Sequence, residues 1–400
     1  MRRYIIIAPM LMIAPLLMAA HATSPAPPAA VAVAFDRKGT KVVISEGLAD
    51  RATGRKVTAD DPVRIASISK LVTAMGVMRL VDQGKLDLDR DVSDYLGWKL
   101  RHPAFPDKPI TLAMLLSHQS GLLDGPDLYI IPLGMTLRER LADPRVWDAA
   151  HAPGSGWFHY TNLNFPVVAS VMERATGERF DRLMARLVLR PLKLDACFNW
   201  GDGCSPATIK RAVVLYRASG DVAKDDLQGR RPDCLVVPAA DGSCDLASYR
   251  PGDNGALFSP QGGLRISMKG LARLGRAISS NAATGFLSQP SYSRMFKPAW
   301  TFDGGNGLGE DGESGFFCAY GLAAQRLANR QKGCRDDLFG DGVMRFGHSG
   351  DAYGLKAGLW FDPWTGRGVA YFTSAVPDGD KGARSAFTSR EEALIDRLPR

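Results

Sequence analysis

The 400-residue sequence lacks several patterns that would place it at once in a large class of proteins. No CxxC pair occurs and no cluster of cysteine and histidine has zinc-finger spacing, so the common zinc motifs are excluded. No run of five or more basic residues occurs, which argues against a nucleic-acid partner. The sequence has no internal repeat, and beyond its N-terminus no apolar run approaches the ~20 residues of a transmembrane helix.

The composition is that of an average globular protein, with 45% hydrophobic and 23% charged residues. It therefore argues against a disordered, collagen-like or coiled-coil chain. The 50 lysines and arginines against 42 acidic residues give a net charge of +8, a mild excess that identifies no partner. A chain of this length buries a large core unaided, and it allows either several domains or one large catalytic domain.

The N-terminus has the layout of a secretory signal peptide. Two arginines at positions 2 and 3 precede an apolar run from Tyr4 to Met18, and small residues stand at Ala20 and Ala22. We expect cleavage after Ala22, so that residues 1–22 are removed, the net charge falls from +8 to +6, and the protein is exported to the periplasm or the medium. An uncleaved N-terminal anchor is the alternative.

Export changes the interpretation of the six cysteines, because disulfides persist in oxidising compartments. Six cysteines allow fifteen pairings, and pairing between sequence neighbours is the simplest. The alternative is six buried thiols. The expected pairs are Cys197 with Cys204, Cys234 with Cys244, and Cys318 with Cys334.

The periodicity of apolar residues predicts strands at both ends of the chain and helices between them. The expected strands are 30–35, 41–46, 263–266, 356–361 and 369–374, and the expected helices are 67–83, 111–117, 162–175, 179–189, 267–278 and 389–398. Residues 197–255 lack periodicity and are interpreted as an inserted, crosslinked loop region.

This order of elements predicts an α/β fold of the α+β type. Hairpins from the two chain ends would share one antiparallel sheet flanked by helices, and the middle of the chain would form a second, mainly helical lobe. We expect one domain over residues 23–400, with a sheet lobe of about 30–95 and 256–400 and a helical lobe of about 96–255.

Ser67-Ile68-Ser69-Lys70 is the first motif that suggests chemistry. Residues three apart lie on one face of a helix, so Ser67 and Lys70 are expected to be neighbours. A serine hydroxyl needs a nearby base to become a nucleophile, and a lysine can serve when burial lowers its pKa. A capping serine with a solvated lysine is the alternative.

Tyr160-Thr161-Asn162 is the second motif, just before a predicted helix. A phenol can relay a proton between nucleophile and leaving group, and an asparagine amide can orient a lysine or a substrate carbonyl. A packed aromatic ring next to a helix-capping asparagine is the alternative.

His348-Ser349-Gly350 is the third motif, followed by an apparent strand. The glycine lets the backbone come close to a ligand, and the amide of Asp351 can then donate to an oxyanion. The side chains of His348 and Ser349 are expected to face the site. A turn with a surface histidine is the alternative.

Each motif occurs once in the chain, in the order SxxK, YxN, HSG. The order and spacing resemble the serine β-lactamase / penicillin-binding-protein superfamily, and within it the class C β-lactamase branch with its D-alanyl-D-alanine carboxypeptidases, D-aminopeptidases and esterases. The likeness covers about residues 30–375 and includes further stretches around Ile65-Ala66, Leu115 to Leu122, and Gly262 to Ser267.

The resemblance implies that Ser67 is the acylated nucleophile, that Lys70 and Tyr160 share the acid/base work, and that no metal or organic cofactor is needed. It also implies that the substrate is a small molecule or a peptide. The residues that it assigns to substrate binding are Asn162, His348, Ser349, Gly350 and Asp351, with the amides of Ser67 and Asp351 forming the oxyanion hole.

One departure from the family pattern bears on specificity. Many members that recognise a substrate carboxylate carry lysine where this chain has His348, and a neutral imidazole is a weaker anchor for an anion. The sequence therefore favours an exported hydrolase of short-chain esters or D-amino-acid amides over a true β-lactamase. The alternative is a penicillin- or peptidoglycan-binding protein that is acylated slowly and turns over little.

Two other interpretations of the same residues are weaker. Residues Gly347 to Asp351 come close to the GxSxG motif of α/β-hydrolases, but Asp351 breaks the pattern and a strand follows. The histidines at 102, 118, 151 and 159 have no metal spacing and are expected to be surface or core groups. The sequence leaves the oligomeric state open.

Overall fold

The computed structural model describes residues 28–125, 128–308 and 315–399. The predicted signal peptide, residues 1–22, lies outside these ranges. Among the helices of the described ranges, none combines the length and the apolar character that crossing a membrane requires.

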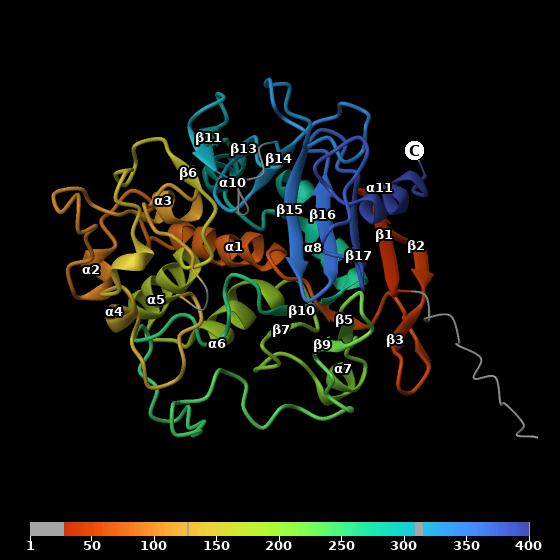
Figure 1. Ribbon diagram of the computed structural model, residues 1–400, viewed down its shortest axis with the longest axis horizontal. Helices are drawn as coiled ribbons and strands as arrows, with labels where there is room; N and C mark the ends of the chain where they lie inside the picture. Colours follow the sequence, from red (N-terminus) through yellow and green to blue (C-terminus); the bar gives the residue numbers. More distant parts are fainter. Residues whose placement is uncertain (1–27, 126–127, 309–314, 400) are drawn as a thin grey trace, which may run out of the picture.

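An antiparallel sheet of eight strands forms one side of the molecule, in the order β11-β13-β14-β15-β16-β17-β1-β2 (Figure 1). The first strand of the described chain pairs with the last, so that Ala30 lies opposite Thr373. The prediction that both chain ends share one sheet is therefore confirmed. The strands are β1 Ala30–Phe35, β2 Thr40–Glu46, β11 Trp300–Thr301, β13 Ala319–Tyr320, β14 Gln325–Leu327, β15 Arg345–Ala352, β16 Leu355–Phe361 and β17 Gly368–Thr373.

Alternation along these strands buries both faces of the sheet. Val31 and Val33 belong to the main core on one face, which also contains the apolar side of helix α8 (Met268–Ser279). Ala30 and Ala32 point the other way, into a smaller core that includes helix α11 (Ser389–Asp396). A helix therefore covers each face.

Helix α1 (Ile68–Asp82) lies between the sheet and the cluster of helices in the middle of the chain (Figure 1). Every residue from Ile68 to Met78 is buried, as expected for a helix that is apolar on all sides. This central position fixes both ends of the helix. The surrounding helices are α2 Ser93–Leu96, α3 Leu112–Leu116, α4 Leu137–Arg140, α5 Asn164–Thr176, α6 Phe180–Met184, α9 Asn281–Thr284 and α10 Gln289–Phe296.

Two predicted elements differ from the structure in detail. The helix expected at 179–189 is α6 followed by a π-helical turn over Ala185–Leu189. The helix expected from Asn162 begins two residues later, at Asn164, for a reason that lies in the candidate site.

The segment from 197 to 255 is largely irregular, as predicted. It carries β7 (Cys197–Phe198), α7 (Pro206–Lys210), β8 (Leu215–Tyr216) and β9 (Val222–Lys224). The three expected disulfides, Cys197–Cys204, Cys234–Cys244 and Cys318–Cys334, are all present. The remaining short strands are β3 Leu48–Asp50, β4 Arg55–Lys56, β5 Pro62–Arg64, β6 Phe158–His159, β10 Leu264–Ser267 and β12 Gly307–Leu308.

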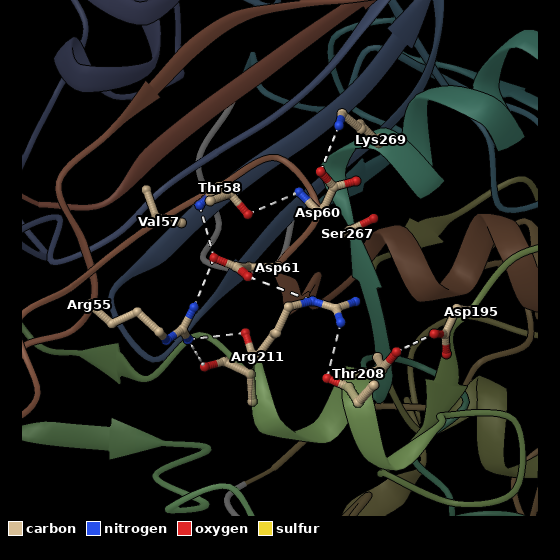
Figure 2. Close-up of polar contacts among 12 residues, drawn as sticks. Arg55, Val57, Thr58, Asp60, Asp61, Asp195, Thr208, Arg211, Ser267 and Lys269 are labelled. Carbon is tan, nitrogen blue, oxygen red and sulfur yellow. Dashed lines mark hydrogen bonds and ion pairs between the residues drawn. The ribbon is translucent and has the colours of Figure 1, made fainter.

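A buried carboxylate joins this segment to the strand that leads to Ser67. Figure 2 shows Asp61, just before β5, between the guanidinium groups of Arg55 and Arg211. Arg55 Nη1 lies 2.9 Å from the carboxylate, and Arg211, at the end of α7, lies 3.9 Å from it. The amide of Thr58 also donates to Asp61 at 2.8 Å. These contacts attach α7 to the start of β5.

Candidate active site

Ser67 stands at the turn from β5 into α1. The residue before it, Ala66, has a φ of +47°, a conformation that costs a non-glycine residue free energy and is often found at functional sites. The Ser67 side chain lines a cavity of about 600 Å³, within the size range of small-molecule sites.

Gly350 allows β15 to run directly beside this turn. A Cβ atom at Gly350 would lie 2.4 Å from the carbonyl oxygen of Ile65, closer than side chains are tolerated. The HSG motif thus lies within β15, and the close approach that its glycine permits is to the backbone next to Ser67. The same strand brings Asp351 to the wall of the cavity.

Lys70 lies one turn into α1, with its side chain fully buried. Its Nζ donates to Ser67 Oγ at 2.9 Å, to Asn162 Oδ1 at 2.6 Å and to the carbonyl oxygen of Gln261 at 3.3 Å. The expected contact between Ser67 and Lys70 is therefore present, and the amide of Asn162 orients the lysine.

Asn162 does not cap α5, because its side chain is directed to Lys70 instead. The turn that leads into α5 is held by Asp124, whose carboxylate accepts from the amides of Asn162 at 2.6 Å and Leu163 at 2.9 Å. Burial raises the pKa of Asp124, against the opposing effect of these two hydrogen bonds. Asp124 was not predicted, since no motif marks a carboxylate that acts across a gap of 38 residues.

Aromatic rings hold Tyr160 on both sides. The ring of His118 stacks on it at a centroid distance of 4.4 Å, and that of Phe317 at 4.7 Å. The Nζ of Lys70 lies 4.6 Å from the centre of the Tyr160 ring, a cation–π contact. The phenol is thus fixed next to the lysine.

His118 is a core group next to the site. Its Nδ1 accepts from the amide of Thr161 at 2.9 Å. Burial, with the charge of Lys70 as a second cause, holds the pKa of His118 well below its ordinary value. The imidazole is therefore neutral at pH 7, and it positions Tyr160 by stacking.

His348 is completely buried in β15, and its Nε2 lies 2.7 Å from the hydroxyl of Tyr320. Its ring centre is 6.1 Å from that of Tyr160. Burial, together with the charge of Lys70, lowers the pKa of His348 to about 3. The position at which many family members carry a lysine is thus occupied here by a buried, neutral side chain.

The structure brings Ser67, Lys70, Tyr160, Asn162 and His348 together, while the other predicted residues lie around them. The hydroxyl of Ser349 donates to Gln325 on β14 at 3.4 Å. The carboxylate of Asp351 forms an ion pair with Lys356 on β16. The catalytic and substrate-binding roles of these residues remain predictions. In the described ranges, no group of three or more histidine, cysteine or acidic side chains could hold a metal ion.

The chain is similar in sequence to curated proteins. The chain is 31% identical to the esterase EstB of Burkholderia gladioli over 61% of its own length and 63% of the relative's. It is 32% identical to the D-alanyl-D-alanine-carboxypeptidase/endopeptidase AmpH of Escherichia coli K12 over 40% of this chain and 42% of AmpH. The chain thus spans less than two thirds of the length of these curated relatives.

A solved structure supports the fold. The D-amino acid amidase of Ochrobactrum anthropi SV3 complexed with D-phenylalanine superimposes with a TM-score of 0.63, covering 92% of each chain at 20% identity. The family described as Beta-lactamase matches residues 24–393, nearly the whole sequence and all the motifs above. The chain therefore belongs to the Beta-lactamase family.

Proposed function

We propose that the protein is an exported serine hydrolase that cleaves an ester or amide through an acyl-enzyme. The observation that carries the proposal is the 2.9 Å contact between Ser67 Oγ and the Nζ of the buried Lys70, at the wall of a cavity of about 600 Å³. A nucleophile in hydrogen-bond contact with a base that a third group orients is the general signature of nucleophilic catalysis.

In the first half of the reaction, Ser67 Oγ forms a bond to the substrate carbonyl carbon, and its proton passes to Lys70 in its neutral amine form or to Tyr160 in its phenolate form. The carbonyl π electrons move to the oxygen, where the amides of Ser67 and Asp351 stabilise the negative charge. When the carbonyl re-forms, the bond to the leaving group breaks and that group takes the proton. Water then attacks the acyl-enzyme in the same manner, releasing the acid and free Ser67.

The neutral state of His348 supports a preference among substrates. A β-lactam carries a carboxylate that many family members bind with a lysine at this position, and here the imidazole carries no charge at pH 7. We therefore propose short-chain esters or D-amino-acid amides ahead of β-lactams. The names of the relatives, an esterase, a D-alanyl-D-alanine carboxypeptidase and a D-amino acid amidase, support the same order.

Export is part of the proposal. It is supported by the predicted signal peptide and by the three disulfides, which persist in oxidising compartments. We propose a single hydrolase domain over residues 23–400 of the sequence.

Turnover of a chromogenic short-chain ester tests the function. Wild type should be active and Ser67→Ala inactive, while Ser248→Ala, which removes an exposed hydroxyl outside the cavity lining, should keep activity. Equal rates for wild type and Ser67→Ala would show that the site is assigned wrongly. A nitrocefin rate equal to the best ester rate would overturn the order of substrates. A stable penicillin adduct on Ser67 without ester turnover would favour the slowly acylated binding protein.

A further inference from the structure

Arg64 presents a half-buried cation to the same cavity as Ser67. It is the last residue of β5, three residues before the nucleophile, and its side chain lines the cavity. The guanidinium lies 5.2 Å from the centre of the Tyr353 ring. Its Nε is buried and has no hydrogen-bond partner among the residues that the structure describes. Burial of such a group is costly unless an acceptor is supplied.

The nearby carboxylates are used by other cations. Arg265, the cross-strand neighbour of Arg64, donates to both carboxylate oxygens of Asp225, at 3.1 and 2.9 Å. Asp351 pairs with Lys356, and the third carboxylate of the cavity wall, Asp226, is exposed to solvent.

Arg64 therefore carries an excess positive charge. Burial, with the charge of Arg265 as a second cause, lowers its pKa to about 10, so the guanidinium is still protonated at pH 7. The Nζ of Lys224, 5.9 Å from the centre of the same Tyr353 ring, adds a second cation on this side of the cavity. An anion is the ligand that this charge distribution favours.

The guanidinium also lies close to the reacting serine. A methyl group at Gly262 would be 3.7 Å from Arg64 Nη2 and 3.8 Å from the carbonyl carbon of Ala66. Arg64 Nη2 therefore lies near the backbone that leads directly into Ser67, within reach of one end of a substrate whose carbonyl is at Ser67.

The position of the cavity indicates which part of the substrate would meet Arg64. The cavity is lined by Ser67, Asn162 and Arg64, whereas Tyr160 and His348 are not among its lining residues. Tyr160 is one of the two groups proposed to pass a proton to the leaving group, so the leaving group belongs on its side of Ser67. The cavity is then the place of the acyl part.

We propose that Arg64 binds a carboxylate on the acyl part of the substrate, so that the preferred substrates are esters or amides whose acyl group ends in a second carboxylate. This inference rests on the proposed hydrolase function and names its substrate class. The planar guanidinium suits the two oxygens of a carboxylate better than an ammonium does. The apolar side chains of Ile131, Val236 and Leu257 line the same cavity and suit the methylene chain between the two carbonyl groups.

The test compares two esters of equal chain length, mono-4-nitrophenyl adipate and 4-nitrophenyl hexanoate. The spontaneous rate of each is subtracted. We expect the ratio of their kcat/KM values to fall at least tenfold in Arg64→Met and by less in Arg64→Lys, because a charge-assisted hydrogen bond contributes about one factor of ten or more. Arg51→Met is the matched control, since Arg51 also stacks on a tyrosine, Tyr216 at 4.5 Å, outside the cavity lining.

A ratio in Arg64→Met within twofold of the wild-type ratio would overturn the inference, as would an equal fall in Arg51→Met. Calorimetric binding of mono-4-nitrophenyl adipate to Ser67→Ala, with and without Arg64→Met, gives a readout that needs no turnover. We expect the Kd to rise at least tenfold. An unchanged Kd would refute the role of Arg64. If Arg64→Met fails to fold, Arg64→Lys and Arg64→Gln take its place.

The two proposals can fail separately. Failure of a fluorophosphonate to label Ser67 would refute the proposed hydrolase function. The calorimetric comparison with and without Arg64→Met would still test whether Arg64 binds a carboxylate. Labelling of Ser67 with no dependence on Arg64 would keep the hydrolase and remove the substrate class.

Discussion

Replacing His348 by glutamine should make the fold less sensitive to acid. The buried imidazole has a pKa of about 3 in the folded protein, whereas the ordinary value, and that of the unfolded chain, is 6.5. Between these two values the unfolded chain binds a proton that the folded chain does not, so stability falls as the pH falls below 6.5. The glutamine variant lacks this titration and keeps an amide that can reach the Tyr320 hydroxyl.

The size of the effect follows from proton linkage. Each pH unit below 6.5 costs about 1.4 kcal/mol of unfolding free energy, so that wild type loses about 2 kcal/mol through His348 between pH 7 and pH 5. Urea unfolding of both proteins at the two pH values measures this loss. Titrating groups that do not interact with His348 contribute equally to both proteins and cancel in the difference.

The wild-type protein should thus lose about 2 kcal/mol more than His348→Gln between pH 7 and pH 5. Equal losses in the two proteins would show that His348 titrates near its ordinary pKa. The imidazole would then be partly charged at pH 6. The argument that His348 is neutral would fail, and with it the proposed preference for esters and D-amino-acid amides over β-lactams.

Three further predictions concern the site and its support. Lys70→Ala should lower kcat/KM for a neutral ester by about 10² to 10⁴-fold, the usual contribution of a general acid or base, and near-normal turnover would separate Lys70 from Ser67. Gly350→Ala should lower the unfolding free energy by about 1 to 3 kcal/mol, because its methyl group meets the Ile65 carbonyl. Gly39→Ala, which has open space, is its control, and equal stability of the two variants in urea would contradict the close approach of β15. Glu173 should change the pH dependence of stability in the direction opposite to His348. Burial raises its pKa to about 7, so its contribution to the free energy of unfolding is lost as the pH rises from 4.5 to 7. Between pH 7 and pH 5 wild type should gain about 2 kcal/mol relative to Glu173→Gln, and a parallel pH dependence of the two would refute this.

The features that the sequence predicted correctly depend on local spacing or on strong patterning. Ser67 and Lys70 meet because they are three residues apart at the start of a helix. The disulfides join neighbours in the chain, separated by 7, 10 and 16 residues. The shared sheet was predicted from the apolar strands at both chain ends. Because these hairpins need a common core, they pair in one antiparallel sheet.

The features that were missed depend on contacts between distant segments. Asp124 binds the amide of Asn162 in the turn before α5, and the Asn162 side chain contacts Lys70 across 92 residues. Local propensity favours asparagine as a helix cap, so the tertiary contact overrides it here. The stacking of His118 on Tyr160 likewise depends on tertiary packing. The excess charge near Arg64 arises because Arg265 forms the ion pair with Asp225.

The central claim is that Ser67 is activated to form a covalent acyl-enzyme. Intact mass of the purified protein after incubation with a fluorophosphonate, followed by peptide mapping, tests it most directly. We predict one adduct per chain, located on Ser67, that is absent from Ser67→Ala and formed much more slowly in Lys70→Ala. An adduct on another residue, or equal labelling of wild type and Ser67→Ala, would contradict the account.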